Sequence, residues 1–342
     1  MIPVVRIWND RYLYKKMYVL QGFDALRRKN KIQLIFESYE EFERRGAPPV
    51  VEGNYQSHKN IIVFDVCFGG RWLHGVYDAN DIYYKIPNSL LRWCDLYFKS
   101  NYQQTYLETG ELLKTNYWDK LPFFDNLVPE PLDISNSRKF RKANFTMNLF
   151  HTDFIRNRLY LHIMNGLWHN SSVDRKKWDC FFIGRYWGET KASTLAILDT
   201  INKKGSTFVG GVVEENELVP DSHRRYIHRP YSLSKWCRTA ASARISIVTR
   251  GLQGCVGFKP LHLLMVGAPF IANQLMSNLW QPLVDGINYI AVKDDFSDLP
   301  EKLEMCTTEK LVEMGKANRE HWNRYVSPES NAKYILSELA MI

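Results

Sequence analysis

The sequence predicts an α/β protein made of two Rossmann-like domains. Its 342 residues exceed the length at which a single hydrophobic core keeps growing, so two domains are expected. Short apolar strands alternate with segments of helical periodicity in both halves of the chain, which is typical of sheets with crossover helices. Polar and basic residues interrupt this alternation at 128–147. A second polar interruption at 170–177 places the domain boundary near residue 172.

The first half is predicted to hold a parallel sheet. Its opening order is strand, helix, strand, loop, strand, which is the order of strands joined by crossovers. The first helix shows apolar residues at positions 13, 17, 20 and 23. The expected elements are strands at 3–8, 32–36, 61–66 and 96–100, and helices at 12–29 and 102–114.

The second half restarts the same pattern after the polar interruptions. A strand ending in Gly184-Arg185 leads into a helix, and a later strand leads into a glycine-rich loop. The elements expected beyond residue 147 are helices at 150–168, 192–202, 231–243, 297–305, 308–325 and 328–342, and strands at 178–185, 244–248 and 270–272.

Residues 250–273 (RGLQGCVGFKPLHLLMVGAPFIAN) form the most informative stretch. Three glycines open it, and Pro260 suits the first turn of a helix, where its missing N–H is not needed. Gly267 stands where a helix favours a left-handed residue, and Pro269 prevents its continuation. Unpaired N–H groups at the start of such a helix favour a phosphate, although glycines in an α/β domain are also ordinary turn residues.

The run GFKPLHLLMVGAPFI within this stretch resembles the donor-site signature of GT-B glycosyltransferases. In that family a Gly-rich loop precedes P-x-L-E-A-M-A-x-G-x-P-V-I. The positions that match, or fall within one residue of a match, are Pro260, Leu261, Met265, Gly267, Pro269 and Ile271. One departure matters, because the family's acidic pair is replaced by Gly254 and His262. That departure leaves the donor and the stereochemistry, inverting or retaining, open.

Other phrases extend the resemblance over residues 178–340. The strand-G-R…K-helix opening is similar to the start of a GT-B C-domain, and it implies that Arg185 and Lys191 bind the donor diphosphate. Residues 283–290 match V-x-D-G-x-N-G-x-x, and CDLYFKS at 94–100 is similar to an N-domain element. The donor-binding residues expected are Arg185, Lys191, Arg250, Gly251, Gly257, Lys259, Pro260 and His262.

The resemblance implies an acceptor-side domain at 1–172, a donor domain at 173–325, and a last helix at 326–342 that packs back on the first domain. An interdomain cleft is expected between the two domains. Asp65, His74 and Asp78 are the candidate catalytic residues, because they lie at or just past the end of the apolar strand at 61–66, and ligands collect beyond strand ends. Asp65 is the first choice as general base, with a capping role as the alternative. His74 and Asp78 are reserves, and Asp10 ranks below them.

The formal net charge is +8, and basic residues cluster at 27–31, 138–142, 156–158 and 175–177. Such clusters bind anionic membrane surfaces or nucleic acid, or form a solvated face. No apolar run is long enough to span a bilayer, and no signal peptide is evident. Six scattered cysteines without a C-x-x-C motif indicate free thiols. These features together predict a cytoplasmic protein, with peripheral contact at the inner face of a membrane.

The predicted activity is transfer of a sugar from a nucleotide-sugar donor to a hydroxyl acceptor, a glycan or lipid-linked saccharide, in polysaccharide biosynthesis. Arg185, Lys191 and Lys259 would stabilise the leaving diphosphate, so neither a metal nor a cofactor is expected. The alternatives are a GT-B sugar epimerase or phosphorylase, a basic nucleic-acid-binding protein, and a catalytically inactive sugar-binding relative. Nucleic acid is the least favoured partner, because no recognition motif is present.

Overall fold

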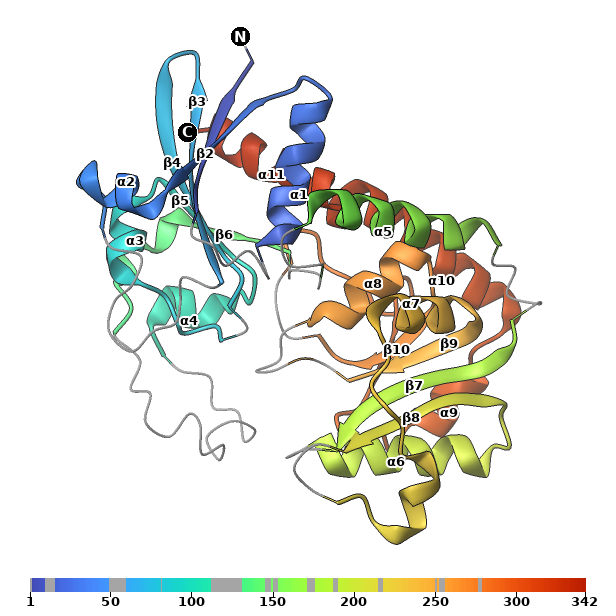
Figure 1. The fold of residues 1–342 in the computed structure, drawn as a ribbon. Coiled ribbons are helices and arrows are strands. Elements are labelled where there is room, and N and C mark those ends of the chain that lie inside the picture. The colour runs from blue at the N-terminus through green and yellow to red at the C-terminus, as the bar shows by residue number, and fades with distance from the viewer. Residues whose placement is uncertain are drawn as a thin grey trace. The chain divides into compact units, whose positions relative to one another are not determined.

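The computed structural model describes residues 2–9, 16–48, 60–80, 82–111, 131–144, 149, 153–170, 176–186, 190–214, 218–249, 251, 256–275 and 279–342. The chain forms two compact units, shown in Figure 1. Residues 1–158, 276–282 and 324–342 belong to the first unit, and residues 159–275 and 283–323 belong to the second. Each unit is built on its own sheet with helices, which confirms the predicted α/β class with two Rossmann-like domains. The predicted boundary at 172 lies outside the described residues.

The first unit holds a six-stranded sheet in the order β2-β1-β3-β4-β5-β6. Strand β3 runs antiparallel to both of its neighbours, while the remaining pairs are parallel. The strands are β1 (Val4–Asn9), β2 (Gln33–Ser38), β3 (Ile61–Phe68), β4 (Arg71–Asp78), β5 (Leu96–Lys99) and β6 (Phe140–Lys142).

The reversal of β3 corrects the prediction of an all-parallel sheet. Gly69 and Gly70 have φ of 58° and 95°, the two left-handed positions of a tight hairpin turn. The chain therefore turns back at once, and residues 71–78 form strand β4 instead of a loop. As a consequence Asp65 lies in the middle of β3 and not at its end.

Helices cover this sheet, and the last helix of the chain is among them. The helices of the first unit are α1 (Met17–Arg28), α2 (Tyr39–Arg44), α3 (Asn88–Trp93), α4 (Gln104–Thr109), the 3₁₀ helix η2 (Ile134–Lys139) and α11 (Pro328–Ala340). Helices α1 and α11 pack so closely that a Cβ on Gly22 would lie 2.0 Å from the carbonyl oxygen of Pro328. The Tyr18 hydroxyl also donates a hydrogen bond to the carbonyl of Val326. The closing helix thus packs on the first unit, as the predicted fold requires.

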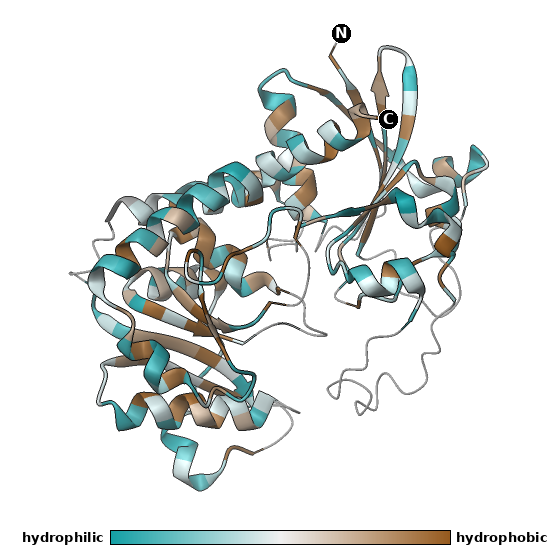
Figure 2. Cartoon of the chain, turned by 180° about the vertical axis from the view of Figure 1, so that it is seen from behind, coloured by the Kyte–Doolittle hydropathy of each residue, from teal (hydrophilic) through white to brown (hydrophobic). Residues whose placement is uncertain are grey.

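The second unit holds a five-stranded, fully parallel sheet in the order β11-β10-β9-β7-β8. Its strands are β7 (Trp178–Tyr186), β8 (Phe208–Glu214), β9 (Ala243–Val248), β10 (Phe270–Asn273) and β11 (Ile290–Val292). Its helices are α6 (Thr190–Lys203), α7 (Leu233–Ala241), α8 (Phe258–Val266), α9 (Leu299–Glu304) and α10 (Thr308–His321), with 3₁₀ helices η3 (Leu167–Asn170) and η5 (Asp221–Tyr226). Buried apolar side chains of these strands and helices form the core. Figure 2, coloured by hydropathy, shows hydrophobic positions in brown along the strands.

Two further elements lie where the chain passes between the units. Helix α5 (Phe154–Gly166) has residues 154–158 in the first unit and the rest in the second. The π-helix η7 (Trp322–Val326) leads from the second unit into α11. No helix in the described ranges is both long and apolar enough for a membrane span.

Candidate functional site

The carboxyl end of β7 and the first turn of α8 meet at one edge of the parallel sheet in the second unit. Lys259 belongs to that turn, and its ammonium donates a hydrogen bond of 2.8 Å to the carbonyl oxygen of Ile183. Ile183 precedes Gly184 and Arg185 on β7. The carboxyl edge of a parallel α/β sheet is where ligands bind, so this contact places two cations at the edge where a ligand is expected.

The electrostatics of Lys259 point to an anion. Burial and the positive charge of Arg185 together lower the pKa of Lys259 to about 8. Within the described part of the chain, no carboxylate is paired with Lys259. A bound anion would relieve the repulsion between the two cations and would raise the pKa of Lys259 again.

The start of α8 supplies backbone donors at the same place. Gly257 caps the helix with φ of 72°, and it has no side chain to accept from the first N–H groups. A Cβ on Gly257 would lie 3.6 Å from the Cα of Gly251, so these two glycines lie close together. Pro260 lies in the first turn, as predicted. Arg250 lies outside the described residues.

Arg185 and Lys191 lie beside the start of α6. The hydroxyl of Thr190 donates a hydrogen bond of 2.9 Å to the Arg185 carbonyl, which ties the helix to the strand end. The Arg185 side chain is exposed, and the Lys191 ammonium lies 5.8 Å from the centre of the Tyr186 ring. A Cβ on Gly184 would lie 2.9 Å from the Thr194 hydroxyl, which explains the glycine before Arg185. The structure therefore places Arg185 in the electrostatic surroundings of Lys259, and it places Lys191 beside Tyr186 at the end of β7.

The position of His262 does not fit the predicted contact with the donor. Its side chain is fully buried, and Nδ1 lies 3.3 Å from the Tyr160 hydroxyl. Trp236 and Phe258 pack against its ring. Burial lowers the pKa of His262 to about 3, so the imidazole is neutral. The signal was present in the sequence, because α8 is apolar on every side and such a helix is buried.

In the first unit Asp65 and His74 face each other on adjacent strands. They are register partners of β3 and β4, and His74 Nδ1 lies 2.8 Å from Asp65 Oδ1. The other carboxylate oxygen accepts from the Trp8 indole at 2.9 Å and lies 3.6 Å from the Arg6 guanidinium. The hydrogen bond to Asp65 raises the pKa of His74. Asp65 is buried and engaged, while 39% of the His74 side chain is exposed, so the imidazole is the group that can reach a substrate.

Two aromatic residues near this pair were not anticipated from the sequence. The Trp93 ring lies 4.4 Å from the His74 ring, and the Arg6 guanidinium lies 4.2 Å from the centre of the Trp72 ring. Alternation along β1 and β4 puts Arg6, Trp72 and His74 on one face of the sheet. Strand alternation was the available signal, but residues 71–78 were interpreted as a loop.

The position of Asp78 does not fit its predicted role as a reserve catalytic residue. It ends β4 in a fully buried position, where Lys99 Nζ lies 3.0 Å from Oδ2 and the Tyr97 hydroxyl donates at 2.8 Å. Asn80 donates its backbone and side-chain N–H groups to the other oxygen. The carboxylate is thus neutralised and enclosed, and its role is structural. Asp10 lies outside the described residues.

No family model matches the sequence, and no curated protein matches it either. Among solved structures the chain is similar to a glycosyltransferase from Rickettsia africae ESF-5, with 11% identity, a TM-score of 0.45 and coverage of 75% of this chain and 68% of that one. It is similar to HepE from Anabaena in complex with UDP and glucose, with 9% identity, a TM-score of 0.46 and coverage of 98% of this chain and 96% of that one. It is also similar to TarM, with 11% identity, a TM-score of 0.39 and coverage of 92% of this chain and 88% of that one. These likenesses are distant, and they identify no substrate.

Within the described ranges, no three or more His, Cys, Asp or Glu side chains are grouped so that they could hold a metal ion. Glu214 belongs to β8, while the acidic residues that follow it at 215 and 217 lie outside the described residues. The edge of the sheet where β7 meets α8 presents ammonium, guanidinium and backbone N–H groups. These groups bind phosphate oxygens, by charge and by hydrogen bonds.

Proposed function

We propose that this protein transfers a sugar from a nucleotide-sugar donor to a hydroxyl acceptor. The observation that carries the proposal is the position of Lys259 in the first turn of α8, bonded to the end of β7, where burial and the positive charge of Arg185 lower its pKa. A nucleoside diphosphate matches this edge, because its charge pairs with both cations and its oxygens accept from backbone N–H groups. These contacts strengthen as the diphosphate departs, and such differential stabilisation accelerates transfer.

His74 is proposed as the general base, in place of Asp65. The acceptor hydroxyl must lose a proton as the sugar arrives, and an imidazole with a pKa near the working pH suits that task. Asp65 accepts the hydrogen bond from Nδ1 and so leaves Nε2 to take the proton. Asp65 is then a positioning residue that acts through His74.

The proposal also covers the need for a metal, the acceptor and the contact with a membrane. With Arg185, Lys191 and Lys259 on the diphosphate, the transfer is proposed to need no metal and no cofactor. The acceptor is proposed to be a glycan or lipid-linked saccharide of polysaccharide biosynthesis, reached from the cytoplasm through peripheral contact with an anionic membrane. The basic surface of the chain, with a net charge of +8, supports that contact.

The first test is a thermal-shift panel of UDP-, GDP-, dTDP-, ADP- and CMP-sugars. A ligand at about 100 times its Kd stabilises the folded state by about 2.7 kcal/mol, which a melting curve resolves. Lys259→Met keeps the apolar stem of the side chain and removes the charge. We expect it to lose the shift, while the control Arg224→Gln keeps it, because Arg224 is exposed and pairs with Asp221, which is also exposed. Equal shifts in both variants would show that the donor binds elsewhere.

A further inference from the structure

Helix α5 carries apolar side chains on its exposed face as well as on its buried face, which is unusual for a helix at a surface. Tyr160 and Met164 point into the protein and are buried. On the other side Ile155, Leu159 and Ile163 are 70%, 57% and 41% exposed. Their spacing of four residues aligns them along one face of the helix. The helix therefore presents a continuous apolar line to its surroundings.

Arginines flank this apolar line. With 3.6 residues per turn, Arg156 lies on one side of the line and Arg158 lies on the other. Arg156 is exposed, and about a third of the Arg158 side chain, 34%, is exposed. Long arginine side chains can lay their stems on an apolar surface and extend their charged ends toward phosphates.

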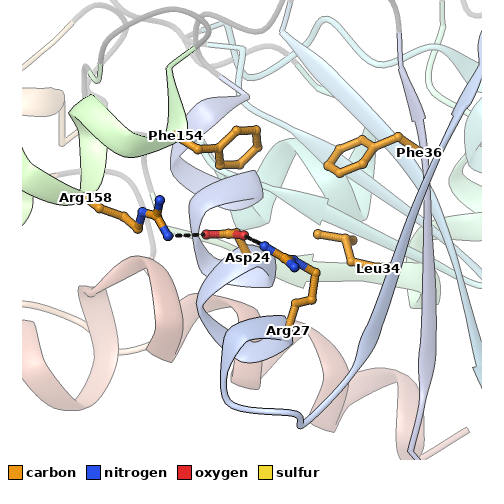
Figure 3. A pocket seen from close by; sticks show the side chains of 6 residues that line it. All are labelled: Asp24, Arg27, Leu34, Phe36, Phe154 and Arg158. Carbon is orange, nitrogen blue, oxygen red and sulfur yellow. Dashed lines mark hydrogen bonds and ion pairs between the residues drawn. The ribbon is translucent and has the colours of Figure 1, made fainter.

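A cavity of about 350 Å³ lies at the N-terminal end of α5, within the first unit. Figure 3 shows Phe154 and Phe36 across it from each other, and their ring centres are 6.4 Å apart. The lining residues are Asp24, Arg27, Leu34, Phe36, Phe154 and Arg158. Phe36 is 47% exposed, so the apolar surface of the cavity continues to the outside.

Among the described residues that line the cavity, positive charges outnumber negative ones. Asp24 is buried, and its carboxylate is shared by three guanidinium groups: Arg27 at 2.7 Å, Arg28 at 3.1 Å and Arg158 at 4.0 Å. One carboxylate neutralises one of these three positive charges. The cavity therefore combines an apolar floor with an excess of positive charge at its rim, which complements an anionic amphiphile.

We propose that the exposed face of α5 and this cavity form a docking surface for an anionic lipid bilayer. Ile155, Leu159 and Ile163 enter the boundary between headgroups and acyl chains, and the arginines bind lipid phosphates. A second copy of the chain is a poorer occupant, because it would bring the same excess of positive charge against this one. The inference deepens the proposed function by naming the surface that makes the peripheral contact.

Vesicle co-sedimentation tests the surface directly. The probes are vesicles of phosphatidylcholine alone and of equal parts phosphatidylcholine and phosphatidylglycerol. The wild-type chain is expected to sediment with the anionic vesicles, and not with the neutral ones. The double variant Leu159→Ser, Ile163→Ser should bind at least tenfold more weakly, because two exposed apolar side chains leave the interface. The matched control Leu218→Ser removes a side chain that is 78% exposed elsewhere, and it should bind like the wild type.

The charge component is tested in the same assay. Arg27→Gln with Arg158→Gln should weaken binding about tenfold or more, whereas Arg224→Gln should not, and added salt should weaken binding in the wild type. Equal binding of the Leu159→Ser, Ile163→Ser variant and the Leu218→Ser control overturns the proposal, as does equal binding to anionic and neutral vesicles. A concentration-dependent dimer, seen by light scattering and abolished in the Leu159→Ser, Ile163→Ser variant, also overturns it, in favour of self-association. The donor-sugar thermal shift of each variant is measured in parallel, so loss of lipid binding is distinguished from failure of the donor site.

Discussion

The ammonium of Lys259 donates a hydrogen bond of 2.8 Å to the carbonyl of Ile183, and this bond fixes the first turn of α8 against the end of β7. It also brings Lys259 within the field of Arg185, which together with burial lowers the pKa of Lys259 to about 8. In the proposed donor site the Lys259 ammonium is therefore already held in place before an anion arrives, which is what preorganisation requires.

Donor binding is expected to weaken at alkaline pH. The protonated form of Lys259 binds the anion, and in the free protein its pKa is about 8. Above that pH the affinity for a nucleoside diphosphate should fall by up to about tenfold for each pH unit, since binding must then take up a proton. Calorimetry from pH 7 to pH 9.5 measures the change. In Lys259→Met this pH dependence should be absent, and a wild-type affinity that stays constant over the range contradicts the assignment.

The pair of Asp65 and His74 should affect stability in a defined pH range. The pKa of His74 is raised in the folded chain, so the stabilisation is fully present below its ordinary value of about 6.5 and is lost as the pH rises through the folded value. Melting temperatures of the wild type and His74→Gln should therefore converge as the pH rises through that range. A difference that is constant with pH would show that His74 contributes only by packing.

Asp65→Asn tests the catalytic proposal separately. The variant should keep donor binding, while the pKa of His74, measured by NMR titration, falls toward its ordinary value. If His74 is the base, the acidic limb of the activity profile should move to lower pH together with that pKa. A limb that stays in place while the NMR pKa moves excludes His74 as the base.

Features that depend on neighbouring residues in the sequence could be predicted, whereas contacts between residues far apart in the chain could not. The loop, helix, turn and strand at 256–273 follow from Pro260 and Gly267, whose effects act on neighbouring residues, and the structure has them as expected. Asp65 was misplaced because Gly69-Gly70 predicts close approach of a ligand as readily as a hairpin turn. The burial of Asp78 depends on Lys99, on a strand 21 residues further along the chain, and no local pattern reveals that pairing.

The buried ion pair of Asp78 and Lys99 should be a structural requirement. Asp78→Asn leaves the Lys99 ammonium uncompensated in the core, and we expect a loss of about 3–5 kcal/mol in the free energy of unfolding. The double variant Asp78→Asn, Lys99→Met removes the unpaired charge and should recover a large part of the loss. Denaturant unfolding measures both. Wild-type stability in the single variant would contradict the structural role assigned to Asp78.

The packing of helix α11 on helix α1 should depend on Gly22. In Gly22→Ala the new methyl group would meet the backbone of Pro328, so α1 and α11 must separate, and a loss of about 2 kcal/mol or more is expected. Gly166→Ala is the matched control, because nothing lies within 4 Å of the added Cβ. Unfolding curves that are the same for Gly22→Ala and Gly166→Ala would contradict this packing of α11.

The most direct test of the central claim is calorimetric titration with a series of three ligands: a nucleoside, its monophosphate and its diphosphate. The nucleobase is the one whose sugar nucleotide gives a thermal shift. If Lys259, Arg185 and the start of α8 hold the diphosphate, affinity should rise at least tenfold from nucleoside to diphosphate. In Lys259→Met that gain should disappear, and in Arg224→Gln it should remain. Equal affinity for nucleoside and diphosphate in the wild type, or an undiminished gain in Lys259→Met, would contradict the account.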